Sequence, residues 1–245
     1  MVVVLDIGNT NIHLGLYNGE KLVKKVICPL TEKSFEDKIL KALKGKRVDG
    51  VAIASVVPRF TTEYSKFFKR RLNISPLIIS PNMDCHLKFG YRKPETLGTD
   101  RIAGVVGGLA RYKRNLIIVD FGTATTLDII LKNGNYLGGI IFPGIETLMD
   151  VLISRTALLK EVSIKKPAHI IGTSTEECIQ SGIFNGTVAM ISGFIREIRK
   201  EYRKKFLCVA TGGWGKIVSS QIKEIKHFDP DLCLFGILKI YYYNA

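Results

Sequence analysis

Two stretches of the chain end a strongly apolar run in residues that could hold a metal ion and a phosphate group. The first is DIGNT (6–10) after VVVL, and the second is DFGTATT (120–126) after LIIV. Carboxylate oxygens bind Mg²⁺ directly or through water. A glycine lets a phosphate approach without a Cβ in the way, and amide and hydroxyl groups donate hydrogen bonds to its oxygens. Both strand ends are therefore candidates for phosphate chemistry.

The two stretches belong to an internal repeat. VVVLDIGNTNIHLGLYNG (2–19) resembles LIIVDFGTATTLDIILKNG (116–134), and Asp6 aligns with Asp120. The offset is close to half of the 245-residue chain, which indicates two similar domains rather than a short-period solenoid. A single D-x-G-N-T is also typical of a plain hairpin. The second copy is what favours a functional interpretation.

Neither loop matches the two familiar phosphate motifs. The dinucleotide fingerprint G-x-G-x-x-G and the P-loop G-x-x-x-x-G-K-[ST] both open a helix, and neither is present in the sequence. Here each turn leads into a second strand, so we expect each loop to be the bend of a β-hairpin. Two such hairpins could clamp the phosphates of a nucleotide from both sides.

The surrounding pattern predicts an α/β fold. Asn18-Gly19 is a strong hairpin signal after the first repeat, and the apolar run VAIASVV (51–57) is typical of a strand covered on both faces. A helix is expected from the cap Ser34 to Gly45. Further helices are predicted at 61–73, 98–114, 145–159, 174–205 and 232–243, and further strands at 76–80, 116–120, 126–131 and 136–142. Hairpins give antiparallel pairs and crossovers parallel ones, so the sheets should be mixed.

The stretch GTDR (98–101) supports two interpretations. In the first, it is only a helix start, with Thr99 as the cap and Asp100 near the positive end of the helix dipole. In the second, Asp100 accepts a proton from a substrate hydroxyl and Arg101 binds an anionic group. The sequence leaves both open. The glycine turns GGIIFPG (138–144) and ATGGWG (210–215) are weak signals taken singly.

Composition narrows the class of protein. The net charge is +14, from 36 basic and 22 acidic residues. The lysines are scattered over polar helix faces, which favours a solvated surface over nucleic-acid binding. The five cysteines form no CxxC pair, so we expect buried, reduced thiols and no zinc site. The N-terminal residues show no signal peptide and the apolar runs are short. We therefore expect a cytoplasmic protein that binds neither nucleic acid nor membrane.

Taken in order, the motifs resemble those of type III pantothenate kinases, a family of the acetate and sugar kinase/Hsp70/actin superfamily. The resemblance runs nearly end to end. The stretches that carry it are DIGNTN (6–11), Tyr91 through PETLGTDR (94–101), DFGTATT (120–126), YLGGIIFPGI (136–145), T-x-x-x-I-Q-S-G (175–182), ATGG (210–213) and DPDL (229–232).

The resemblance implies a fold and an activity. The fold would be two duplicated ribonuclease H-like domains, 1–114 and 115–245, with mixed sheets flanked by helices and a nucleotide cleft between them. The activity would be ATP-dependent phosphorylation of pantothenate to 4′-phosphopantothenate, the first step toward coenzyme A. It also implies Mg²⁺, a monovalent cation (K⁺ or NH₄⁺), and a cytoplasmic homodimer with the substrate site near the subunit interface.

The resemblance also implies roles for individual residues. The ATP-binding set would be Asp6, Ile7, Gly8, Asn9, Thr10, Asn11, Ile12, His13 and Thr123. The pantothenate-binding set would be Tyr91, Gly98, Thr99, Asp100, Arg101 and Thr175. Asp100 would be the general base, Asp120 would ligate the monovalent cation, and Asp6 would hold magnesium, directly or through water.

Some positions depart from the family pattern or stay open. Ser174 stands where many relatives carry Asn, and Trp214 follows the ATGG turn where smaller residues are expected. A tryptophan there could stack on adenine, but packing into the core or a dimer interface is favoured for a lone Trp. His13 either touches a phosphate or points outward. The Asp84-Cys85-His86 stretch is too compact for a metal site and has no predicted role.

Two alternative functions remain at this stage. One is a transcriptional accessory protein on the same scaffold, since fold does not fix function. Retention of Asp6, Asp100 and Asp120 disfavours it, because an inactive relative should have lost one of them. The other is a kinase for a different small alcohol, which the pantothenate-like set Tyr91, Arg101 and Thr175 disfavours.

Overall fold

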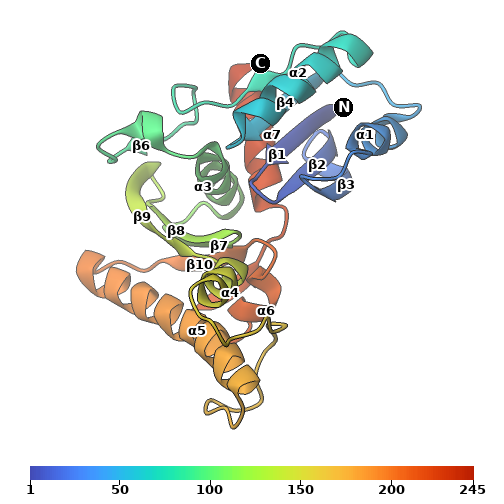
Figure 1. Ribbon diagram of the computed structural model, residues 1–245. Coiled ribbons are helices and arrows are strands. Elements are labelled where there is room, and N and C mark those ends of the chain that lie inside the picture. Colours follow the sequence, from blue (N-terminus) through green and yellow to red (C-terminus); the bar gives the residue numbers. More distant parts are fainter. The chain divides into compact units, whose positions relative to one another are not determined.

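The computed structural model describes residues 1–245, which form two compact units (Figure 1). The first unit comprises Met1–Lys113, Asn133–Tyr136 and Asp231–Ala245, and the second comprises Arg114–Lys132 and Leu137–Pro230. Each unit carries strands and helices, and the predicted mixed α/β class is confirmed. The domain limits at 114/115 and the nucleotide cleft stay predictions.

A five-stranded mixed sheet forms the centre of the first unit. Its strands are β1 (Val2–Ile7), β2 (Asn11–Asn18), β3 (Lys21–Pro29), β4 (Gly50–Ser55) and β5 (Leu77–Ile78), in the order β3-β2-β1-β4-β5. β1 is antiparallel to β2 and parallel to β4. The hairpin between β2 and β3 turns at Gly19, whose φ of 56° suits a glycine. The hairpin predicted at Asn18-Gly19 is therefore confirmed.

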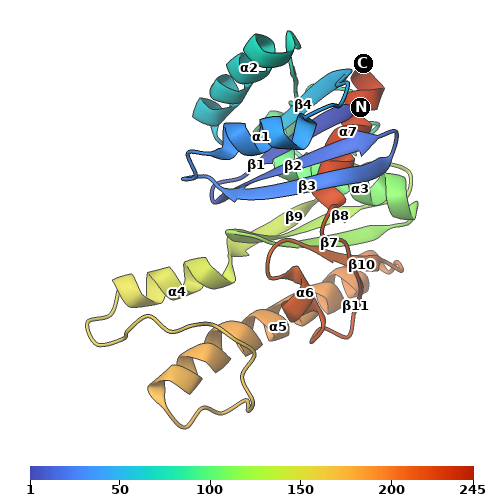
Figure 2. The ribbon, with the colours of Figure 1, turned by 90° about the vertical axis from the view of Figure 1, so that its right-hand side faces the viewer.

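Helices cover both faces of this sheet (Figure 2). They are α1 (Phe35–Leu43), α2 (Pro58–Leu72), α3 (Thr99–Tyr112) and α7 (Leu232–Asn244), with a short 3₁₀ turn η1 (Pro94–Thr96). Leu5 and Ile7 of β1 share a buried core with Phe35 of α1 and Phe67 of α2. β1 and β4 also contact α7, which covers the opposite face. Side chains that alternate along β1 therefore pack against α1 and α2 on one face of the sheet and against α7 on the other.

Glycines let α3 and α7 approach each other closely. A Cβ on Gly107 would overlap the carbonyl oxygen of Leu232, and one on Gly236 would overlap that of Ala103. Backbone atoms cannot move aside as a flexible side chain can, so these positions require glycine. The glycines that weaken the helix signal over 98–114 are therefore the contacts that fasten the C-terminal helix into the first unit.

The Asp84-Cys85-His86 stretch has a structural role in the first unit. The side chain of Asn244, at the end of α7, accepts from the Asp84 N–H and donates to the Asp84 carbonyl, at 3.2 and 2.8 Å. The His86 ring packs edge-on against Tyr243, with ring centroids 4.1 Å apart. The stretch thus holds the end of the last helix.

The second unit is built on a second mixed sheet. Its strands are β7 (Leu116–Phe121), β8 (Ala124–Ile130), β9 (Asn135–Pro143), β10 (Leu207–Thr211) and β11 (Ile225–Phe228), in the order β11-β10-β7-β8-β9. β7 is antiparallel to β8 and parallel to β10. The first residues of β9 belong to the first unit, where Asn135 and Tyr136 pair with β6 (Lys88–Phe89).

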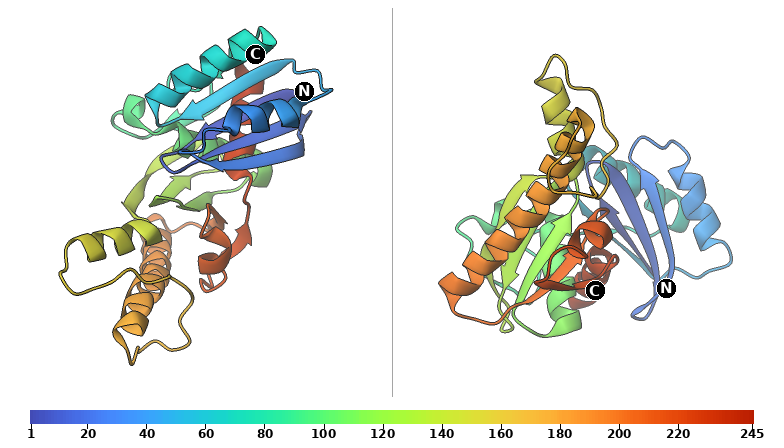
Figure 3. Two further views of the ribbon diagram at one scale, coloured as in Figure 1. Left: turned by 45° about the vertical axis from the view of Figure 1, so that its right-hand side comes forward. Right: turned by 90° about the horizontal axis from the view of Figure 1, so that it is seen from below.

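Three helices pack on this second sheet: α4 (Ile145–Ser154), α5 (Thr175–Tyr202) and α6 (Gly215–Ser219). Figure 3 shows the long α5 beside the strands. By length and composition α5 could cross a membrane, which is weak evidence, because core helices of soluble proteins pass the same test. Its residues Phe184, Ile191 and Ile195 share a buried core with Val119 of β7. α5 is therefore a core helix of this unit.

The structure differs from the sequence predictions at several element ends and at one cysteine. The helices predicted at 145–159 and 174–205 end earlier, at Ser154 and Tyr202, and helix ends are the least certain part of any such prediction. All five cysteines are free, but Cys178 is exposed, so the expectation of buried thiols is wrong there. Burial raises the pKa of the Cys85 and Cys208 thiols to about 11, which keeps them protonated.

Candidate functional site

The first loop is the bend of a β-hairpin, as predicted. Asp6 is opposite His13 on β2 and opposite Ala54 on β4. The Gly8 N–H donates to the Asn11 carbonyl at 3.0 Å and closes the turn. The side chains between them, Asn9 and Thr10, are exposed. The loop therefore presents a carboxylate, an amide and a hydroxyl at the carboxyl end of β1.

His13 lies near a partly buried ion pair. The pKa of its imidazole is lowered to about 4, mainly by burial and then by the Lys25 ammonium, while the Asp231 carboxylate opposes both. Lys25 Nζ lies 2.6 Å from Asp231 Oδ1, at the start of α7. His13 is therefore uncharged near neutral pH. Toward a phosphate it could act as a neutral hydrogen-bond donor but not as a cation.

Thr99 ties the GTDR stretch to the same sheet edge. Its hydroxyl donates to the Ser55 carbonyl at 3.1 Å and accepts from the Ser55 N–H at 3.0 Å. Ser55 is the last residue of β4 and pairs with Ile7, next to the first loop. Gly98, not Thr99, holds the N-cap position, and no side chain caps the helix there. The cap interpretation of Thr99 is wrong, because its hydroxyl serves as a strand partner.

Asp100 follows directly and lies over a glycine. Its Oδ1 accepts a hydrogen bond from the backbone N–H of Arg101 at 2.8 Å. A Cβ on Gly98 would overlap this same carboxylate oxygen. Gly98 thus leaves room for the Asp100 carboxylate, and the bond to Arg101 fixes one of its two oxygens.

Arg101 and Tyr91 both contact Tyr136, a residue to which the sequence motifs assign no role. Arg101 Nη2 donates to Tyr136 Oη at 2.9 Å, and the Tyr91 and Tyr136 rings lie 6.0 Å apart between centroids. Tyr136 opens the motif YLGGIIFPGI, but nothing in the motif itself assigns it a partner. The structure therefore brings Tyr91, Gly98, Thr99, Asp100 and Arg101 together in the first unit, with Tyr136 added.

The second loop begins at Asp120 in the second unit, where it packs against the ATGG turn. Asp120 pairs with Thr211 across β7 and β10. Gly212 follows in the left-handed conformation, with φ of 87°. A Cβ there would lie 2.6 Å from both Phe121 N and Phe121 O, and closer still to Asp120 Oδ1. The ATGG turn therefore packs directly on Asp120.

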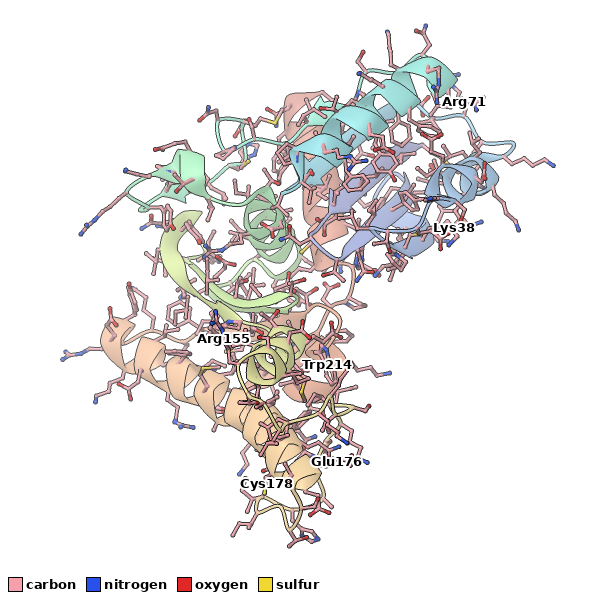
Figure 4. All side chains as sticks on the ribbon, viewed as in Figure 1. Lys38, Arg71, Arg155, Glu176, Cys178 and Trp214 are labelled. Carbon is pink, nitrogen blue, oxygen red and sulfur yellow. The ribbon has the colours of Figure 1, made fainter.

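The start of α4 supports the rest of this loop. The carbonyl of Thr123 accepts from the Gly144 N–H at 2.9 Å and from the Thr147 hydroxyl at 2.7 Å. Trp214, at the start of α6 (Figure 4), is partly buried against the core and donates its indole N–H to Glu146 at 3.3 Å. The core-packing interpretation of Trp214 is supported. Stacking on adenine stays a prediction.

Thr175 begins α5 in the second unit, whereas the other predicted substrate residues belong to the first unit. The Ser174 hydroxyl accepts from the Glu177 N–H at 3.3 Å, and Glu177 Oε2 accepts from the N–H and the hydroxyl of Thr173 at 2.7 Å each. These bonds satisfy donors at the helix start. Ser174 therefore works as the cap of α5, and the exposed Thr175 follows it in the first turn.

Comparison with known proteins identifies the family. The family profile described as type III pantothenate kinase matches residues 2–197. The chain belongs to the type III pantothenate kinase family. Family members with that name include one from Sulfurihydrogenibium sp. (strain YO3AOP1), 35% identical over 97% of this chain and 98% of that one, and one from Persephonella marina, 36% identical over the whole of both chains.

Solved structures agree on the fold. A protein described as a conserved putative Baf family transcriptional activator from Campylobacter jejuni matches with a TM-score of 0.61 and 22% identity, over 98% of this chain and 97% of that one. A ROK family glucokinase from Streptomyces griseus, solved with glucose and AMPPNP, matches with a TM-score of 0.55 and 11% identity, over 98% of both chains. At these identities the likeness shows the fold alone.

The carboxylates of the two loops fit a magnesium ion that is bound together with a nucleotide. No group of three or more His, Cys, Asp or Glu side chains that could hold a metal ion occurs in the structure. Mg²⁺ usually keeps several waters and binds through one or two carboxylates plus substrate phosphates. Asp6 supplies such a carboxylate at the first loop, and Asp120 supplies another, with hard oxygen atoms suited to K⁺, at the second.

Proposed function

We propose that the protein transfers the γ-phosphoryl group of ATP to the primary hydroxyl of pantothenate, giving 4′-phosphopantothenate and ADP. The observation that carries this is the family match over residues 2–197, together with an Asp100 carboxylate fixed beside the first phosphate loop through Thr99 and Ser55. Retention of Asp6, Asp100 and Asp120 gives no support to a purely regulatory role.

The acceptor side of the reaction is assigned to the first unit. Asp100 accepts the hydroxyl proton as the hydroxyl oxygen bonds to the γ-phosphorus and the bond from that phosphorus to the bridging oxygen of ADP breaks. An ordinary carboxylate is a weak base, but it suffices when the transition state is loose and the proton leaves late. Arg101 binds the carboxylate of pantothenate, and Tyr91 of the first unit and Thr175 of the second unit are also assigned to pantothenate binding.

The donor side is assigned to the two loops. Residues 6–13 and Thr123 bind the phosphates of ATP, with Mg²⁺ at Asp6 and the monovalent cation at Asp120. Magnesium supplies neutralisation of the charge on the transferring phosphoryl group. The chain's own part is alignment, which provides most of the catalysis in phosphoryl transfer. Both substrates are anions, which the net charge of +14 attracts. We place the protein in the cytoplasm, where both are found.

The first experiment is ATP-dependent phosphorylation of pantothenate by the purified protein with magnesium, in potassium and then in sodium buffer. ADP release is followed by a coupled assay and the product by mass spectrometry. We expect turnover in potassium and at least a tenfold loss in sodium. A folded protein that binds ATP but does not phosphorylate pantothenate in either buffer would contradict the proposal and direct the search to other small alcohols.

We also propose that the protein is a homodimer through the second unit. Large apolar side chains are exposed on and after α4, where Leu158 is 91% exposed and Ile171 is 78% exposed. Exposed apolar surface often marks a protein–protein contact where it is contiguous. Ile141 of β9, Val151 of α4 and Ile170 are also exposed.

Leu158→Asp is expected to convert the dimer to a monomer, because it places a charge in the buried contact. Light scattering coupled to size exclusion measures the mass directly. Val23→Asp, at an exposed apolar residue of β3 in the first unit, is the matched control and should stay dimeric. A wild-type protein that elutes as a monomer at micromolar concentration would contradict the proposal.

A further inference from the structure

A cavity with a basic wall lies in the second unit. Its volume is about 330 Å³, at the lower end of the range of roughly 300–1,000 Å³ that is typical of small-ligand sites. No acidic side chain lines this basic cavity, so the charged part of its wall is entirely positive. The lining residues, all from the second unit, are Arg114, Asn115, Lys132, Lys205, Phe206 and Leu207.

The basic cavity lies at the end of the second sheet that is opposite to the Asp120 loop. Its residues come just before β7, just after β8 and at the start of β10, and Leu116 of β7 pairs with both Ile130 of β8 and Leu207 of β10. A rise of roughly 3.3 Å per residue places Asp120 about 13 Å further along β7 than Leu116. A ligand in the basic cavity is therefore bound apart from the second phosphate loop.

Asn115 holds the segments of the wall together. Its side-chain amide donates to the Lys205 carbonyl at 3.2 Å, and its side-chain oxygen accepts from the Lys132 N–H at 2.9 Å. Its backbone carbonyl accepts from the Leu207 N–H at 2.9 Å. The backbone segments that carry the basic side chains are therefore fixed relative to one another before any ligand binds.

The three basic side chains of the wall have their charges available for a ligand. Arg114, Lys132 and Lys205 are all exposed, and none of them forms an ion pair within the chain. Arginine binds phosphate oxygens through two parallel hydrogen bonds, and lysine binds them as a point charge. A single carboxylate would neutralise only one of the three cations. A ligand with several negative charges matches this wall better.

We propose that the basic cavity binds a small molecule that carries two or more phosphate groups, at a site separate from the nucleotide site. The ammonium groups of Lys132 and Lys205 and the guanidinium of Arg114 contact the phosphate oxygens. Asn115 keeps the three segments at the spacing that the ligand requires. The proposal does not depend on which alcohol the protein phosphorylates.

Equilibrium dialysis of labelled inorganic pyrophosphate tests this proposal. The nucleotide site is first saturated with magnesium and AMPPNP, so that pyrophosphate cannot report on the phosphate loops. We expect saturable binding with a Kd below about 1 mM at an ionic strength of about 0.1 M. Lys132→Gln/Lys205→Gln should raise this Kd at least about tenfold, because two charged contacts are lost. Its kinase kinetics should stay those of the wild type.

Lys223→Gln/Lys226→Gln is the matched control, because it removes the same charge from exposed residues of the same unit that do not line the cavity. It should bind pyrophosphate as the wild type does. Asn115→Ala keeps every cation but removes both side-chain bonds, and it should also weaken binding. The absence of saturable binding to the wild type, or equal effects of the two lysine pairs, would overturn the proposal.

A labelled DNA duplex is titrated under the same conditions, because nucleic acid also presents phosphate groups. We expect the wild type and Lys132→Gln/Lys205→Gln to bind the duplex equally weakly. Duplex binding that requires these two lysines, together with no binding of pyrophosphate, would overturn the proposal of a small ligand and assign the basic wall to a nucleic-acid backbone.

Discussion

Asp100→Asn is expected to lower kcat for pantothenate phosphorylation by about 10²–10⁴-fold, the usual contribution of a positioned general base. The asparagine side chain has the same shape, and its oxygen can still accept from the Arg101 N–H, as Asp100 Oδ1 does at 2.8 Å. What the variant loses is the ability to take a proton from the substrate hydroxyl. The KM for pantothenate should therefore change little, and the loss should appear almost entirely in kcat.

The control for Asp100→Asn is Asp37→Asn, which makes the same change at an exposed residue of α1. It removes one negative charge from the same unit and should leave kcat within about twofold. Initial rates at saturating ATP and magnesium separate kcat from KM. A variant of Asp100 that keeps more than about a tenth of the wild-type kcat would show that another group, or solvent, accepts the proton.

The strand ends and their loops were predictable because their signals are local. Apolar alternation and the pair Asn18-Gly19 predict the first hairpin, and Gly19 adopts the positive φ that such a turn requires. The alignment of Asp6 with Asp120 likewise needs only the sequence repeat. The place of each carboxylate, at the end of a buried strand, is then enough to make it a candidate for phosphate chemistry. These features depend on neighbours within a few residues, which is the range that pattern reasoning covers.

The contacts that hold the residues of the proposed acceptor site were not predictable from local patterns. Thr99 bonds to Ser55, which is 44 positions away, and Arg101 bonds to Tyr136, which is 35 positions away. A threonine before an aspartate at a helix start has the local pattern of a cap. Here the Thr99 hydroxyl bonds instead to the backbone of Ser55, at the end of β4. Local propensity cannot show which distant backbone group will be within reach.

Two glycines inside helices likewise could not be explained from the local sequence. Gly107 and Gly236 look unfavourable inside helices, because glycine lowers helix propensity. Their reason appears only in three dimensions, where α3 and α7 cross with no room for a Cβ on either residue. The sequence shows that a glycine is present, but the partner that makes it necessary lies more than a hundred residues away. For Gly212 the partner is Asp120, and this leads to the second large effect expected.

Gly212→Ala is expected to lower kcat/KM for ATP by at least about a hundredfold. Two physical effects combine at this residue. A left-handed conformation, here with φ of 87°, costs an alanine about 1–2 kcal/mol. The new Cβ would also lie 2.6 Å from Phe121 N and Phe121 O and would overlap Asp120 Oδ1. Because the Phe121 atoms belong to a central strand, the turn or the Asp120 carboxylate must move instead, and both are assigned to nucleotide and cation binding.

The chain contains a single tryptophan, Trp214, and it follows this turn, so its fluorescence reports on the nucleotide side without turnover. Addition of MgATP should change the emission of the wild type and leave that of Gly212→Ala unchanged. Gly193→Ala is the control, because a Cβ at this position of α5 would meet nothing within 4 Å and alanine favours a helix. It should keep wild-type kinetics and the wild-type fluorescence response. If Gly212→Ala bound MgATP as tightly as the wild type, Asp120 and the turn would not be coupled through this contact, and the cation site would have to be sought elsewhere on the second loop.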